Sequence, residues 1–155
     1  MNKWIELAIA IAIPLVVGTT IGAIMAARSK SSYADFKKPS WNPPPWAFSV
    51  IWPILYAAMG IASWMIWQMK PSMYRTLALS AYALQLILNF AWSPVFFALS
   101  KIAGLYLILA LDALVLVTFG LFLKVDWRAG LILIPYVAWL AVATILNLSV
   151  VKLNS

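Results

Sequence analysis

Residues 102–123 read IAGLYLILALDALVLVTFGLFL, and Asp112 is the one charged residue in this stretch. A helix that crosses the hydrocarbon core of a bilayer needs about 20 mostly apolar residues. The stretch is continuous in its apolar character and lacks the alternation of apolar and polar residues that marks the strands of a membrane β-barrel. We therefore predict that it forms a transmembrane α-helix.

Four further apolar runs of similar length predict spans at residues 5–27, 46–69, 76–99 and 129–151. The chain is 65% hydrophobic and 10% charged, whereas ordinary soluble domains are about 25% charged. Short polar joints separate the last four spans, and such joints make neighbouring helices antiparallel. We expect an all-α membrane protein in which residues 1–155 form one domain, a bundle of five transmembrane helices.

One connection differs from the others, because residues 28–45 are polar, mixed in charge and rich in aromatic residues and proline. We predict a long loop here between the first and second helices, and connections of this length are often binding loops or lids. The run Pro43-Pro44-Pro45 suits the first turn of a helix and predicts a stiff beginning for the second span.

The sequence contains no Cys and no His. This excludes disulfides, thiol nucleophiles, His general bases and His ligation of haem, and we expect no metal site and no covalently bound cofactor. The net charge of +7 comes from basic residues at the ends of the apolar runs, where Lys and Arg meet lipid headgroups. The expected partner is the lipid bilayer, and nucleic acid is excluded.

Nine Trp residues stand out in so short a chain. Four of them lie near predicted helix ends and fit the aromatic belt at the membrane interfaces: Trp4, Trp46, Trp67 and Trp127. Three lie deeper in the predicted spans: Trp52, Trp92 and Trp139. These three either line a cavity or face lipid and the protein core.

Helical spacing places the deeper Trp residues on faces that also carry aromatic, small or polar side chains. These faces are Trp52, Tyr56 and Gly60 on the second span, Asn89, Trp92 and Phe96 on the third, and Tyr136, Trp139, Ala143 and Asn147 on the fifth. Packed together, they predict a pocket with flat walls and a few hydrogen-bonding groups, as a planar apolar ligand requires. Carboxylates on such a ligand could pair with Lys37 or Lys38 in the loop.

A carboxylate in the middle of a span is costly and usually faces the interior of the bundle. Asp112 has two interpretations. It is either a structural hydrogen-bond partner, for example of Asn89, Gln85 or Asn147, or a relay for protons or substrate. The second interpretation gives an alternative function, a proton-coupled small-molecule transporter that uses Asp112.

Helix-distorting and small residues complete the pattern. Pro53 and Pro135 adjoin the predicted pocket residues, and kinks there would open space. Gly18 and Gly22 form a small-xxx-small face that suits close helix packing or dimerisation.

Taken together, these residues resemble the translocator protein / tryptophan-rich sensory protein family (TspO/MBR), also called peripheral-type benzodiazepine receptors. The matching stretches are KPSWNPP at 38–44, the segment from Trp52 to Gly60, LNFAWSPVFF at 88–97, Asp112, and PYVAW at 135–139 followed by Ala143 and Asn147. They cover nearly the whole chain in the order and at the spacing of the family.

The resemblance implies a five-helix bundle, commonly a homodimer, that binds porphyrins, notably protoporphyrin IX, and other planar lipophilic ligands. It implies a pocket between the helices beneath the first loop, lined by Tyr33, Trp41, Trp52, Tyr56, Asn89, Trp92, Trp139, Ala143 and Asn147. Phe96 joins this set from the spacing on the third span. The implied function is a membrane receptor or sensor, with transport of the ligand left open.

No nucleophile–base pair supports conventional catalysis. In some bacterial members of the family, however, the residues that match Trp52 and Trp139 are linked to light-dependent porphyrin breakdown. The sterol motif of the animal members needs a Tyr near the C-terminus, and the segment from Asn147 to Lys152 has none, so sterol binding is not expected. We expect an integral, multi-pass protein of a bacterial cell membrane.

Overall fold

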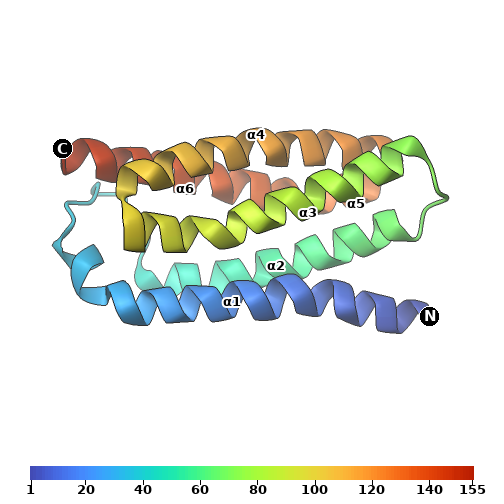
Figure 1. Ribbon diagram of the computed structural model, residues 1–155, viewed down its shortest axis with the longest axis horizontal. Helices are drawn as coiled ribbons and strands as arrows, with labels where there is room; N and C mark the ends of the chain where they lie inside the picture. The colour runs from blue at the N-terminus through green and yellow to red at the C-terminus, as the bar shows by residue number, and fades with distance from the viewer.

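The computed structural model covers residues 1–155 and describes the backbone throughout and the side chains of all residues except 29–33. It is a bundle of long helices that run side by side, with the two chain termini at opposite ends (Figure 1). The elements are α1 (Lys3–Asp35), α2 (Pro45–Trp67), α3 (Met73–Pro94), the π-helical turn η1 (Val95–Leu99), α4 (Lys101–Val125), α5 (Trp127–Ile132) and α6 (Ile134–Leu153).

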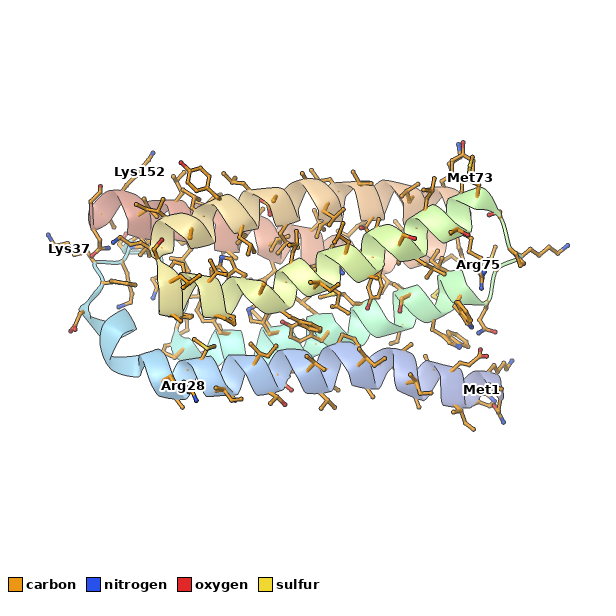
Figure 2. All side chains as sticks on the ribbon, viewed as in Figure 1. Met1, Arg28, Lys37, Met73, Arg75 and Lys152 are labelled. Atoms are coloured by element: carbon orange, nitrogen blue, oxygen red, sulfur yellow. The ribbon has the colours of Figure 1, made fainter. Side chains whose placement is uncertain are left out.

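Five helical segments are long and apolar enough to cross a membrane: Lys3–Arg28, Pro45–Trp67, Met73–Leu99, Lys101–Val125 and Trp127–Leu153. This confirms the predicted fold class. Large apolar side chains cover the outside of the bundle, as Ile54 shows with 62% of its surface exposed. Labelled charged side chains lie toward the ends, Lys37 and Lys152 at one and Arg75 at the other (Figure 2). The chain is therefore an integral, multi-pass membrane protein.

Polar residues at the joints begin the helices. The side chains of Ser72, Ser100 and Asp126 accept hydrogen bonds from backbone N–H groups in the first turns of α3, α4 and α5. Pro44 is extended and Pro45 occupies the first turn of α2, as the proline run predicted.

The predicted loop at residues 28–45 is too long by eight residues at its start, because α1 continues to Asp35. Residues 28–35 contain neither Gly nor Pro, so their polarity ends the membrane span without ending the helix. The connection between α1 and α2 is accordingly shorter than predicted, residues 36–44, which we call the first loop.

The prolines act in different ways. The fifth span is interrupted at Leu133, between α5 and α6, two residues before Pro135, whose missing N–H cannot continue the hydrogen-bond ladder. Pro94 is the last residue of α3 and is followed by the π-helical turn η1. By contrast, α2 continues through Pro53 as one helix.

Close contact between α1 and α2 depends on glycine. A Cβ atom on Gly60 would clash with the backbone of Ala10 and Ile11, and one on Gly18 would clash with the ring of Tyr56. Around Gly22 there is open space. Of the two glycines in the predicted small-residue face, Gly18 therefore serves packing within the chain, where it lets α1 lie against α2.

The main hydrophobic core runs through the bundle and contains both aliphatic and aromatic side chains. Side chains with no exposed surface, among them Ala62, Ile66 and Ala78, belong to the parts of α2 and α3 nearest the connection between these helices, where the ring pair of Tyr82 and Phe122 also packs. Most of the other ring pairs lie from the middle of the bundle toward the first loop, and the candidate site lies there.

Candidate functional site

A chain of hydrogen bonds crosses the middle of the bundle. The hydroxyl of Tyr56 on α2 donates to Oδ1 of Asn89 on α3 over 2.7 Å. Nδ2 of Asn89 donates to the hydroxyl of Tyr136 on α6 over 2.9 Å, and this hydroxyl donates to Oε1 of Gln85 over 2.8 Å. All four residues are buried. Tyr56 and Asn89, both predicted site residues, are thus in contact. Their polar atoms form hydrogen bonds within the protein, to each other and to Tyr136.

Aromatic rings pack around this chain. Trp52 stacks on Tyr56 with ring centroids 5.5 Å apart and meets Tyr136 edge-on at 6.4 Å. Phe48 meets Trp139 edge-on at 5.6 Å. The result is an aromatic wall from α2 and α6, formed by Phe48, Trp52, Tyr56, Tyr136 and Trp139. Phe48 was not among the predicted residues, although it lies one helical turn before Trp52 and the same spacing rule could have found it.

A groove lies between α2 and α6, next to this wall. It has a volume of about 330 Å³, opens outward from the bundle, and is lined by Ile51, Ile54, Leu55, Pro135, Ala138, Trp139 and Val142. Both helices belong to membrane-spanning segments, so the groove faces the bilayer. Trp139 is the one predicted site residue in its lining.

The indole nitrogen of Trp139 is buried and has no hydrogen-bond partner within the described part of the chain. A buried N–H donor without an acceptor costs free energy, and the great majority of such groups in proteins are paired. An indole can only donate a hydrogen bond. This position therefore lacks an acceptor, which a bound molecule could supply.

A second aromatic group lies where η1 joins α4. Trp92 stacks on Phe96 with centroids 5.1 Å apart, and its indole N–H donates to Oδ1 of Asn147 over 3.1 Å. Nδ2 of Asn147 donates to the carbonyl oxygen of Lys101. Three more predicted site residues are thus in contact with one another. Trp92 also packs against the main hydrophobic core, which links the two aromatic groups.

The first loop lies over this second group. The ring of Phe36 meets Phe96 edge-on at 6.2 Å, and Nζ of Lys101 lies 5.6 Å from the centroid of the Phe36 ring. The backbone of Lys37 is held at both polar atoms: its N–H donates to Oδ1 of Asn154 over 2.9 Å, and its carbonyl accepts from Nδ2 of Asn154 over 2.9 Å. We call this pairing the Asn154 clasp.

The remaining predicted residues are more scattered. Ala143 is buried in the core, whereas Trp41 is 47% exposed. The side chain of Lys37 is exposed and extends outward from the loop end of the bundle (Figure 2), and Nζ of Lys38 donates to the carbonyl of Phe36. The side chain of Tyr33 lies outside the described residues. The four Trp residues assigned to the interfacial belt are all exposed.

Asp112 makes the interhelical hydrogen bond that its position predicts, but with another partner. Oδ2 of Asp112 on α4 accepts from the hydroxyl of Thr144 on α6 over 2.8 Å. Asn89 and Gln85 are instead occupied by the tyrosine hydroxyls, and Asn147 by Trp92 and Lys101. The three suggested partners were wrong, because Asn89 and Gln85 pair with Tyr hydroxyls and Asn147 pairs with Trp92 and the backbone of Lys101. Among the described residues, no group of three or more His, Cys, Asp or Glu could hold a metal ion.

The fold and these side chains define a class: a multi-pass α-helical membrane protein with an aromatic wall beside a bilayer-facing groove. Residues 10–153 match the model of the TspO/MBR family. The chain belongs to the TspO/MBR family.

Relatives agree with this assignment. The chain is 43% identical to "Protein CrtK" of Rhodobacter capsulatus, over 79% of this chain and 78% of that protein. It is 35% identical to the "Tryptophan-rich protein TspO" of Chlorobaculum tepidum, over 99% of both chains. It is 40% identical to the "Translocator protein" of Sus scrofa, over 79% of this chain and 74% of that protein.

Proposed function

We propose that this protein is a membrane receptor or sensor that binds planar lipophilic ligands of the porphyrin type, with protoporphyrin IX as the representative ligand. The names of two relatives, the "Tryptophan-rich sensory protein" of Cereibacter sphaeroides and the "Translocator protein" of Sus scrofa, support a role in sensing or handling a ligand. The observation that carries the proposal is the aromatic wall from α2 and α6, with Trp139 at its edge lining the groove.

The energetics favour a flat, aromatic ligand. A molecule already dissolved in the bilayer gains little from hydrophobic transfer, so selectivity depends on shape, stacking and polar contacts. Each good aromatic contact adds about 0.5–1.5 kcal/mol beyond area burial. The groove, at about 330 Å³, lies at the lower end of the size range of small-molecule sites, which suits a flat ligand inserted edge-on.

Polar groups would then fix the ligand's orientation. The unpaired indole N–H of Trp139 calls for a ligand acceptor, such as a carboxyl oxygen or a ring nitrogen. Lys37 and Lys38 in the first loop are the proposed partners for ligand carboxylates that reach the membrane surface. By family resemblance, we also propose a homodimer in a bacterial cell membrane.

Titration of the purified protein in detergent with protoporphyrin IX, followed by tryptophan quenching and porphyrin absorbance, tests the site. We expect Trp139→Ala and Trp52→Ala each to weaken binding by about ten-fold or more. Trp139→Ala removes a ring and a donor that line the groove, and Trp52→Ala removes the ring that packs on Tyr56 and Tyr136 in the wall. Trp127→Ala is the matched control, because Trp127 is 62% exposed and lies outside the wall. Unchanged affinity in both test variants would remove the proposed site.

The presence of Trp52 and Trp139 in one aromatic wall also bears on photochemistry. A porphyrin in the groove would lie beside the indole ring of Trp139, which can exchange an electron with its excited state. Absorbance spectra of the bound porphyrin, recorded with and without light and oxygen, separate a reaction from simple binding. Loss of the porphyrin spectrum in light with oxygen, abolished by Trp139→Phe, would assign a degradative activity.

A further inference from the structure

The boundary between α2 and α6 is loosely closed. The extensive backbone contacts are between α1 and α2, α3 and α4, and α4 and α6, whereas α2 and α6 meet mainly through side chains, among them the ring pairs of Phe48 with Trp139 and Trp52 with Tyr136. The groove occupies the remaining space. Its lining residues Ile54 and Ala138 are exposed on the outside of the bundle.

The end of the bundle beneath the first loop is, by contrast, tied down. The Asn154 clasp holds both backbone polar atoms of Lys37, and Asn154 is itself fixed through Nδ2 to the carbonyl of Val150 on α6. Phe36 adds an edge contact with Phe96 and a cation–π contact with Lys101. A ligand entering from water at this end would have to break several of these contacts.

We propose that the planar ligand enters and leaves from the acyl-chain region of the bilayer, through the groove between α2 and α6, with Trp139 as the gating side chain. This inference rests on the proposed function. The first loop then serves as a fixed cover, and only side chains need to move for exchange. Side-chain rotation is fast and local, whereas opening the loop would break the two hydrogen bonds between Lys37 and Asn154.

Cysteine locks test the two routes directly, because the sequence contains no Cys of its own. The groove lock is Ile54→Cys with Ala138→Cys, two exposed positions on opposite sides of the groove, joined by a short bifunctional thiol reagent with a cleavable disulfide. The loop lock is Phe36→Cys with Lys101→Cys, which replaces the contact between the first loop and α4 by the same covalent link and leaves Lys37 and the Asn154 clasp unchanged. Each single-Cys variant treated with the reagent serves as a control for labelling alone.

The measurement is the association rate of protoporphyrin IX already dissolved in liposomes that contain the protein, followed by quenching of tryptophan fluorescence. We expect the groove lock to slow association by about ten-fold or more and a reductant to restore the rate, while the loop lock leaves the rate within about two-fold. If the loop lock slows association and the groove lock does not, entry through the groove between α2 and α6 is overturned, and the proposed function is left intact. Absence of porphyrin binding by the reduced, unlocked variants overturns the proposed function itself.

Discussion

Nδ2 of Asn89 donates to the hydroxyl of Tyr136 over 2.9 Å, and this contact joins α3 to α6 in the centre of the bundle. The same hydroxyl donates a hydrogen bond to Oε1 of Gln85. Tyr136 is therefore the one member of the chain that both accepts and donates through a single oxygen, and its loss would leave two buried partners unpaired.

We expect Tyr136→Phe to destabilise the protein more than Tyr56→Phe, although both substitutions keep the ring. Tyr136→Phe removes two hydrogen bonds, and each buried group left unpaired costs about 1–3 kcal/mol in proteins generally and nearer 0.6 kcal/mol in measured membrane cases. Tyr56→Phe removes one bond. Unfolding in mixed detergent, monitored by circular dichroism, gives both values, with Tyr106→Phe, an exposed site, as control. Equal losses in the free energy of unfolding for Tyr136→Phe and Tyr56→Phe would contradict a chain of hydrogen bonds that passes through Tyr136.

Glycine substitutions test the contact between α1 and α2. Gly60→Ala places a methyl group against the backbone of Ala10, which cannot rotate away, so α2 must separate from α1. We expect a loss of about 1–3 kcal/mol in the free energy of unfolding. Gly120→Ala is the matched control, because Gly120 lies in α4 with open space around it and Ala favours helix by about 1 kcal/mol. The two substitutions should therefore have opposite signs, and a neutral Gly60→Ala would argue against this helix contact.

How far the sequence could predict this molecule depends on the kind of signal. Hydropathy predicted the five spans closely, because in a bilayer the length of an apolar run is the physical requirement for crossing. It could not predict that α1 continues to Asp35, since polarity ends a span and only Gly, Pro or a cap ends a helix.

Helical spacing predicted which side chains share a face but not what each face meets. The face of Trp52 and Tyr56 turned to the core and to Tyr136, whereas the face of Trp92 and Phe96 turned to Asn147 and the first loop. Partner choice depends on the rotation of each helix, which a single sequence does not contain. For the same reason the hydrogen bond from Thr144 to Asp112 was not foreseen.

Asp126 makes stability depend on pH at the joint between α4 and α5. A hydrogen bond from the side chain of Arg128 is the main cause that lowers the pKa of the Asp126 carboxyl below its ordinary value, and the carboxylate also accepts from the backbone N–H of Arg128. A lowered native pKa means that the charged form is favoured in the folded state. This stabilisation is complete above the ordinary carboxyl pKa and is lost as pH falls through the lower native one.

We therefore expect the unfolding midpoint of the wild-type protein in detergent to fall below about pH 4, where the carboxyl becomes protonated. Asp126→Asn should be less stable than wild type at pH 7 and should show a smaller fall on acidification, because Asn still caps α5 but does not ionise. Glu6→Gln is the control, because Glu6 is another carboxylate near the end of a helix and its side chain accepts a hydrogen bond from Gln68. Parallel curves for wild type and Asp126→Asn between pH 7 and 3 would show that this ion pair has no such role.

Substitution of Asp112 distinguishes the proposed receptor function from the alternative, a proton-coupled transporter. Its contact with Thr144 ties α4 to α6, and Asp112→Asn keeps an oxygen that can accept from the same hydroxyl. We expect the free energy of unfolding of Asp112→Asn to lie within about 0.5 kcal/mol of the wild-type value, and its affinity for protoporphyrin IX to be unchanged. Thr144→Val cannot donate this hydrogen bond and should lose about 0.6 kcal/mol or more.

Ligand flux into liposomes under a pH gradient is then measured for both variants. Flux that is driven by the gradient in wild type and in Thr144→Val, but abolished in Asp112→Asn, would assign the carboxylate to proton coupling, because only ionisation distinguishes Asp from Asn there. Flux independent of the gradient in all three proteins leaves Asp112 as an interhelical hydrogen-bond acceptor, the role that its geometry favours.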